Sequence, residues 1–314
     1  MSRIATFEED SGMPLTLSNF ANYYRLDIRA IYSKYSFSRL CVAAGLREDF
    51  DEPVETILTK AMGRLTAVDS RRWIRFLLDI LPKLDNVEFG GLTPVEQRML
   101  QMFYITVWLK SADRWDNEEV LDNLYALSDS PVMLAELMEL LRYKYERIDF
   151  IDEPVDLGFD CPLDLHCTYT RDQLLVALDF MNPNSVREGV KWLPEKQIDV
   201  LFVTLNKSDK DYSPTTMYND YSINEELFHW QSQSTTTDTG SVGQRYINHR
   251  KRGSRVLLFV REYKSDMVGA APYTFLGTVN YVKHNGSRPM NITWRLDRPI
   301  PAKYLKKTNK LVVG

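Results

Sequence analysis

The chain has 314 residues, of which 44% are hydrophobic and 26% are charged, and this composition is typical of a folded protein rather than a fibrous or low-complexity one. The net charge of −4 conceals a split, because residues 239–314 hold 15 Lys/Arg and 3 Asp/Glu, whereas residues 1–238 hold 24 and 40. A basic part of this kind is the usual electrostatic footprint of a polyanion-binding protein.

The compartment expected for the chain is the cytoplasm. Its three cysteines, Cys41, Cys161 and Cys167, are too few and too odd in number for a disulfide framework. The first residues, MSRIATFEEDSG, lack the basic and apolar regions of a signal peptide. No apolar run reaches the length of a membrane span, so no membrane partner is expected.

Residues 15–150 are predicted to be helical, because apolar residues recur there at spacings of three and four. Asp69 or Ser70 caps a predicted helix that carries Trp73, and Ser130-Pro131 opens another. Thr93-Pro94-Val95-Glu96 has the form of a capping box with proline at the first helical position. The acidic, proline-broken segment 149–165 follows, so residues 1–165 are interpreted as a helical connecting or docking domain.

Residues 166–314 are interpreted as a second, basic domain. Thr170-Arg171-Asp172-Gln173 is a further capping box, and Ser222-Ile223-Asn224-Glu225 has the same form and predicts a short helix. Strand-like runs are found at 198–204, 228–233, 254–263, 273–282 and 290–296, and Asn285-Gly286 marks a turn. The predicted fold class is therefore α+β: an all-helical domain followed by a small, mostly antiparallel, barrel-like sheet with short helices.

The segment from Thr204 to His249 is rich in Ser, Thr, Asn and Gln, with Tyr212, Tyr218, Tyr221, Trp230 and Tyr246 spaced among them. Aromatic faces beside amides and hydroxyls suit the recognition of a base. Arginines and lysines near these residues suit contacts to phosphates. The candidate nucleic-acid-binding residues are Trp230, Gln231, Gln233, Arg245, Tyr246, His249, Arg250, Lys251, Arg261 and Lys264. Trp230→Ala is accordingly expected to weaken binding without unfolding the domain.

Motifs for phosphate-cradling loops, nucleophile elbows and dinucleotide binding are absent from the sequence, so no cofactor is expected. No metal site is predicted, because the segment with Cys161, His166 and Cys167 has no fourth ligand at a recognisable spacing. Glu262 and Lys264 stand at the E-x-K spacing of some metal-dependent nucleases, and Asp209, Asp211, Asp220 and Glu225 are the acids available to complete such a site. A nuclease is therefore kept as an alternative to a binding module.

Several segments resemble the C-terminal module, called domain of unknown function 3427, of large bacterial proteins that join a phospholipase-D-like nuclease to a DEAD/DEAH-type helicase. They include CPLDLHCTYTRDQ, DVLFVTLNKSDKDYSPTTMYNDYSINEELFHWQSQS, GQRYINH and YTFLGTVNYVKHNGSRPMNITW, and the helical segment IYSKYSFSRLCVAAGL also fits, so the resemblance extends over most of the chain. It implies a role in restriction or anti-phage defence and a helicase or nuclease partner. The architecture resembles PUA-like or EVE-like folds, which hold an extruded or modified base.

The function predicted from these observations is DNA binding, with sensing of a modified or flipped base, on behalf of a restriction-type helicase–nuclease. A flipped base costs a few kcal/mol of unstacking, which stacking on Trp230 or Tyr246 would offset. Arg245, Arg261 and Lys264 would hold the backbone. Two alternatives remain open: a protein-interaction module that regulates a helicase, and a metal-dependent nuclease that uses Glu262 and Lys264.

Overall fold

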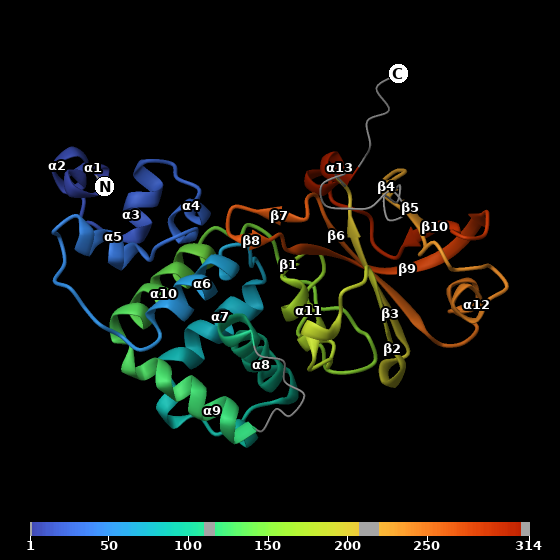
Figure 1. The fold of residues 1–314 in the computed structure, drawn as a ribbon, viewed down its shortest axis with the longest axis horizontal. Coiled ribbons are helices and arrows are strands. Elements are labelled where there is room, and N and C mark those ends of the chain that lie inside the picture. Colours follow the sequence, from blue (N-terminus) through green and yellow to red (C-terminus); the bar gives the residue numbers. More distant parts are fainter. Residues whose placement is uncertain (1, 110–116, 207–219, 309–314) are drawn as a thin grey trace. The chain divides into compact units, whose positions relative to one another are not determined.

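The computed structural model describes residues 2–109, 117–206 and 220–308 (Figure 1). The chain divides into two compact units. The helical unit comprises Met1–Ser185 together with Met267–Gly269, and the sheet unit comprises Val186–Asp266 together with Ala270–Gly314. This division comes later in the chain than the predicted boundary at residue 165.

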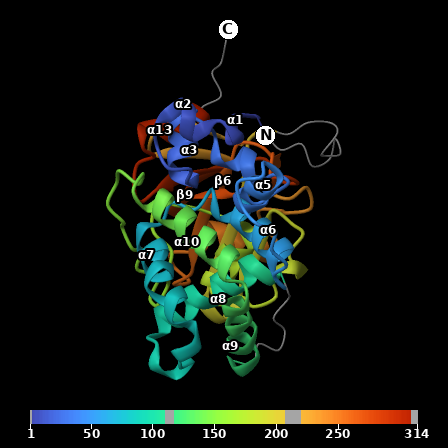
Figure 2. The same ribbon diagram turned by 90° about the vertical axis from the view of Figure 1, so that its left-hand side faces the viewer.

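The helical unit is built from short and medium helices, and α6, α7, α8 and α10 pack on one another (Figures 1 and 2). Its helices are α1 (Ser2–Ala5), α2 (Phe7–Ser11), α3 (Leu17–Tyr23), α4 (Ile28–Tyr32), α5 (Phe37–Ala43), α6 (Glu55–Leu65), α7 (Arg71–Ile80), α8 (Pro94–Trp108), α9 (Asn117–Tyr125), α10 (Pro131–Tyr145) and α11 (Arg171–Ala177), with 3-10 turns at Leu81–Asn86, Phe89–Gly91, Ala126–Asp129 and Pro183–Ser185. Within the described ranges, no helix is long and apolar enough to cross a membrane.

The predicted helix starts are confirmed where the cap is local. Thr93 Oγ1 accepts from the Glu96 amide at 3.3 Å, and the Glu96 carboxylate accepts from the Thr93 amide at 2.8 Å, so α8 has its capping box. Thr170 and Gln173 form the same arrangement at the start of α11. Ser70, one of the two residues proposed as a cap for α7, accepts from the Trp73 amide at 3.2 Å.

Two helix starts also receive carboxylates that are distant in sequence, and one of them, α5, has in addition a local cap in Ser36, which accepts from the Arg39 amide at 3.0 Å. Glu52 accepts from the amides of Val132 and Met133 at 2.7 and 2.9 Å at the start of α10, where the Ser130 side chain forms no cap hydrogen bond. Glu136 of α10 accepts from the first two amides of α5 at 2.7 Å each. Carboxylates at helix N-termini satisfy otherwise unpaired N–H groups and oppose the helix dipole.

The sheet unit is a mixed, mostly antiparallel sheet. Its main path has the order β2-β3-β6-β9-β10-β5-β4, in which β3 and β6 pair in parallel and the other neighbours are antiparallel. The bounds are β2 (Val190–Leu193), β3 (Ile198–Thr204), β4 (Tyr221–Ser222), β5 (Leu227–Gln231), β6 (Arg255–Arg261), β9 (Tyr273–Asn285) and β10 (Asn291–Leu296); β1 (Thr168–Tyr169), β7 (Ser265–Asp266) and β8 (Gly269–Ala270) lie outside this path, and a 3-10 turn spans Pro194–Lys196.

The α+β class, with helices first and a mostly antiparallel sheet with short helices after them, is confirmed. The predicted strands all exist, and Gly286 takes a φ of 73° in the turn between β9 and β10. The barrel is not closed among the described strands, because β2 and β4 end the path without pairing with each other.

Among the described residues of the polar segment, one predicted helix is absent and one helix was not predicted. Residues 222–225 form no helix, because Ser222 belongs to β4 and the Asn224 side chain accepts from the amides of Glu226 and Leu227 in a turn. The helix in this region is α12 (Ser241–Asn248), which the sequence analysis missed. Its Gly243 is required by close packing, since a Cβ there would lie 2.0 Å from the Thr237 carbonyl oxygen.

The hydrophobic core of the sheet unit covers one face of the sheet. Val256, Leu258, Phe228, Ile292 and Trp294 point to this side from three strands, β6, β5 and β10. Val242, Tyr246 and Ile247 of α12 pack against it, as do Tyr304 and Leu305 of α13 (Ala302–Thr308). We call this side the helix-covered face. Figure 1 shows α12 beside β9.

Candidate nucleic-acid interface

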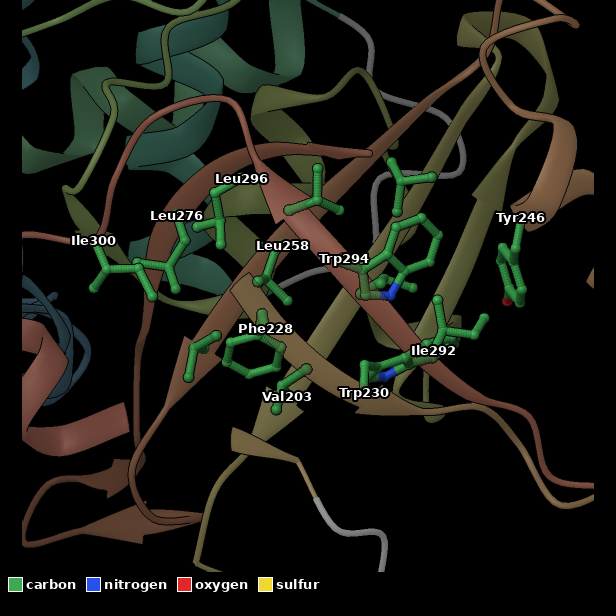
Figure 3. Close-up of a cluster of buried hydrophobic side chains, with 14 of the residues drawn as sticks. Val203, Phe228, Trp230, Tyr246, Leu258, Leu276, Ile292, Trp294, Leu296 and Ile300 are labelled. Atoms are coloured by element: carbon green, nitrogen blue, oxygen red, sulfur yellow. The ribbon is translucent and has the colours of Figure 1, made fainter. Parts of the chain in front are cut away.

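The aromatic rings predicted to stack on a base lie inside the hydrophobic core. Trp230 is 4% exposed and Tyr246 is fully buried. Tyr246 reaches from α12 toward Trp230 and Trp294, and its ring centroid lies 5.4 Å from that of Trp230 in an edge-on arrangement (Figure 3). Because neither ring face is open to solvent, Trp230 and Tyr246 do not form the predicted base-stacking surface.

Arg245 is held in an ion pair rather than presented to a phosphate. Its Nε and Nη2 donate to the two carboxylate oxygens of the fully buried Asp199 at 2.7 and 2.8 Å. The guanidinium also lies 4.3 Å from the centroid of the Trp192 ring. Burial raises the pKa of Asp199, and the Arg245 charge opposes this shift. Arg245 is therefore a structural partner of a carboxylate that would be costly to leave unpaired.

Arg261 and His249 also have structural partners. Arg261 donates to Thr204 Oγ1 at 2.9 Å and to the Ala271 carbonyl at 3.1 Å. The His249 ring is buried; its Nδ1 faces the Ser254 carbonyl at 3.3 Å, and its Nε2 accepts from the Tyr281 amide at 3.1 Å. Since a carbonyl only accepts hydrogen bonds, we assign the ring hydrogen to Nδ1, which leaves a neutral imidazole. Neither side chain is arranged for a phosphate.

The two glutamines predicted as site residues, Gln231 and Gln233, have different surroundings. Gln231 lies on β5 opposite Asn291 of β10, and its Nε2 donates to Asn291 Oδ1 at 3.1 Å. Gln233 lies beyond the end of β5, where its side-chain and backbone oxygens accept from Thr236 in a turn. The predicted strand at 228–233 therefore ends at Gln231, and Gln233 does not share a strand face with it.

A polar row crosses four strands on the face opposite the helix-covered one. The register places Tyr221 of β4 beside His229 of β5, His229 beside Thr293 of β10, and Thr293 beside Lys283 of β9. The Tyr221 and His229 rings stack with centroids 4.8 Å apart and planes inclined by 14°, and both are half-buried. Gln231, Asn291 and Asn285 form a neighbouring row of amides. These seven residues define the polar face.

Exposed cations stand on the polar side of the sheet and in the turn that follows α12. Lys283 and Arg295 stand on the sheet itself, and Arg250, Lys251 and Arg252 lie at the end of α12. Arg250 donates to Asn280 of β9 at 2.8 Å, and Asn280 is the register partner of Arg295, so the turn is joined to the sheet margin. Among the described residues, Lys251, Arg252, Lys283 and Arg295 form no side-chain hydrogen bond or ion pair. We call these five residues the cation group.

The residues of the nuclease alternative form no metal centre in the described part of the chain. Glu262 is half-buried and Lys264 is exposed, just after β6. Over the described ranges, the only group of three potential ligand side chains within 4.8 Å of one another is Asp152, Asp164 and Cys167, in the helical unit. The Asp164 carboxylate there already accepts from Ser70 at 2.7 Å and pairs with Arg72 at 3.0 Å. Tyr212, Tyr218, Asp209 and Asp211 lie outside the described residues.

The site residues predicted from the sequence do not include His229, Thr293, Lys283 or Arg295. The sequence does indicate two residues of this face, because FHWQ at 228–231 alternates apolar and polar residues. Burial of Phe228 and Trp230 turns His229 and Gln231 to the other side of the strand. The partners on β9 and β10 could not be read in this way, since they depend on the strand register.

Comparison with known proteins gives a family match in the second part of the chain. No curated protein matches the sequence. The family match spans residues 163–307, so the helical segment at residues 31–46, which contributed to the resemblance seen in the sequence, lies outside it. Residues 163–307 match the model of a protein family described as a domain of unknown function, DUF3427, and the polar face and the cation group lie within this region.

Proposed function

We propose that the sheet unit binds DNA through the cation group and the polar face. The observation that supports this best is the contrast between two sets of arginines and lysines. Arg245 and Arg261 are paired with protein groups, whereas Lys283 and Arg295 are exposed on the sheet and Lys251 and Arg252 are exposed in the turn after α12. Unpaired cations next to amide side chains are suited to phosphate contacts, which supply most of the sequence-independent affinity for DNA.

The charge of each unit agrees with this assignment. Residues 186–314 hold 20 Lys/Arg and 12 Asp/Glu, a net charge of +8, whereas residues 1–185 hold 19 and 31, a net charge of −12. A polyanion is attracted by the first and repelled by the second. We therefore extend the proposal to the partner expected from the resemblance: a helicase or nuclease would contact the helical unit and leave the sheet unit for DNA.

The proposal does not include base reading by Trp230 or Tyr246, because both rings are buried. It also omits nuclease chemistry, since Glu262 belongs to no group of three potential metal-ligand side chains among the described residues. An interaction module without DNA affinity is the remaining alternative, and the experiment below separates it from the proposal.

The test is the binding of a fluorescently labelled DNA, measured by anisotropy at about 50 and about 200 mM salt. The wild-type affinity should fall steeply with salt. Lys283→Gln/Arg295→Gln should weaken binding at low salt and reduce the logarithmic salt slope by about 2, or about 1 for each lost phosphate contact.

The matched control is Lys303→Gln/Lys306→Gln, which removes the same charge from exposed positions on α13. It should leave the slope near the wild-type value. Equal losses in both variants would mean that only the overall charge matters, and a wild-type protein that binds no DNA at low salt would leave the interaction module as the better explanation.

A further inference from the structure

We infer that the polar face takes single-stranded DNA, with a base stacking on the Tyr221–His229 ring pair. This inference rests on the proposed function and adds to it the strand state of the ligand and the residues that contact a base. The ring pair is on the same sheet face as the amide row and as Lys283 and Arg295, so ring, amide and cationic groups share one face of the sheet.

The order of residues across the sheet supports a strand lying over it. Tyr221, His229, Thr293 and Lys283 follow one another on four adjacent strands, so the row runs from two half-buried rings past the buried Thr293 to an exposed cation. Neighbouring strands are about 4.8 Å apart, and the row is therefore about 14 Å long. A nucleotide chain that crosses it can place a base on the rings and a phosphate near Lys283 or Arg295.

The stack of two rings ends at the last strand of the described path. Tyr221 lies on β4, the last strand of the described path, so no neighbouring strand among the described residues covers the ring face turned away from His229. The planes of the two rings are nearly parallel at 14°, and a base on the outer face of Tyr221 would continue this arrangement. Gln231 and Asn291, two residues further along β5 and β10, supply amide groups on the same sheet face.

A duplex fits this surface poorly. The bases of a duplex are already stacked on each other and expose only their edges in the grooves, and the major groove admits a helix or a two-stranded ribbon. The polar face is part of a sheet that is four strands wide here, with β4, β5, β10 and β9 side by side. Aromatic rings on such a face become useful only when the bases are unstacked and free to lie on them.

The experiment compares wild-type binding of labelled oligothymidylate of about 16 nucleotides with binding of a duplex of the same length. The single strand should bind at least about tenfold more tightly. Tyr221→Leu, which removes the ring but keeps an apolar side chain, should weaken single-strand binding by about five- to tenfold and leave the residual duplex binding unchanged. Tyr221→Phe should retain wild-type affinity, because it keeps the ring.

Tyr263→Leu is the matched control, since Tyr263 is an exposed tyrosine just after β6 and outside the polar face. A second readout needs no variant: 2-aminopurine placed within the single strand should lose fluorescence on binding as it stacks on a ring. Duplex binding as tight as single-strand binding, an equal loss in Tyr221→Leu and Tyr263→Leu, or unquenched 2-aminopurine in the complex would each overturn the inference and leave DNA binding intact. Failure of both DNA forms to bind would instead overturn the proposed function.

Discussion

His229 and Trp230 are adjacent in the chain but have opposite surroundings. Trp230 points into the core under α12, whereas His229 lies on the polar face beside Tyr221. Successive side chains of a strand point to opposite faces, so a shift of one position separates a core residue from a surface residue. The choice of Trp230 as a ligand contact was wrong for this reason, although the segment that contains it carries both kinds of residue.

Trp230→Ala should destabilise the sheet unit by about 3–5 kcal/mol, because it opens a cavity among Tyr246, Ile292 and Trp294. The midpoint of urea unfolding is the measurement, and Tyr221→Ala, at a half-buried position on the other face, should cost much less. A Trp230→Ala protein with the wild-type midpoint would place the ring outside the core and restore the stacking surface that the sequence predicts.

His249 should make stability depend on pH. Burial is the main cause that lowers the pKa of this imidazole, and protonation would also remove the Nε2 acceptor of the Tyr281 amide. The native state therefore binds fewer protons than the unfolded state, and stability increases with pH. The contribution is fully present above the unfolded pKa of about 6.5 and is lost as the pH falls through the lower native pKa.

The measurement is the unfolding free energy between about pH 7.5 and about pH 5.5, a range that spans the unfolded histidine pKa. His249→Gln should have a flatter profile over this range, whatever its absolute stability. An unchanged slope in His249→Gln would show that another group is responsible.

At the scale of elements, helix starts differ in how far away their caps lie in sequence. The capping boxes of α8 and α11 are local, and the sequence analysis identified both. Glu52 caps α10, and Glu136 adds to the local Ser36 cap of α5; packing brings both carboxylates to these helix ends. No local pattern identifies a cap of this kind, because the donor and the acceptor are far apart in the chain.

Glu136→Ala should therefore cost about 3 kcal/mol, because it leaves the amides of Phe37 and Ser38 without an acceptor in a buried position. Glu139→Ala is the matched control on the same helix, since Glu139 accepts a single, half-buried bond from the Ser18 amide. Thermal unfolding should show a clearly larger loss for Glu136→Ala, and similar losses in the two variants would contradict a capping role for Glu136.

The remaining elements were likewise predicted well where residues close together in the sequence indicate them. β3 has the predicted bounds, and β6, β9 and β10 deviate from theirs by a few residues at their ends, because long runs of β-branched and aromatic residues predict a strand locally. α12 was missed because its serine, glycine and asparagine are weak helix formers. Its packing on the core through Tyr246, Val242 and Ile247 stabilises it in the folded protein.

At the scale of the whole molecule, the charge is divided between the two units, with −12 on residues 1–185 and +8 on residues 186–314. This division follows from composition, and the sequence predicts it without knowledge of the fold. It indicates that a polyanion would be recognised by the sheet unit. It does not indicate which arginines and lysines are available, because Arg245 and Arg261 count toward the positive charge while their side chains are held by protein groups.

The sequence by itself determined the α+β class, the order of helices and strands, the local helix caps and the charge of each part, since all of these depend on residues that are close together in the chain or on simple counts. Only the tertiary structure decided which face each strand turns to the core, which cations remain exposed and which residues share the polar face. These features depend on strand register and on helix packing, which join Tyr221, His229, Thr293 and Lys283 from separate parts of the chain.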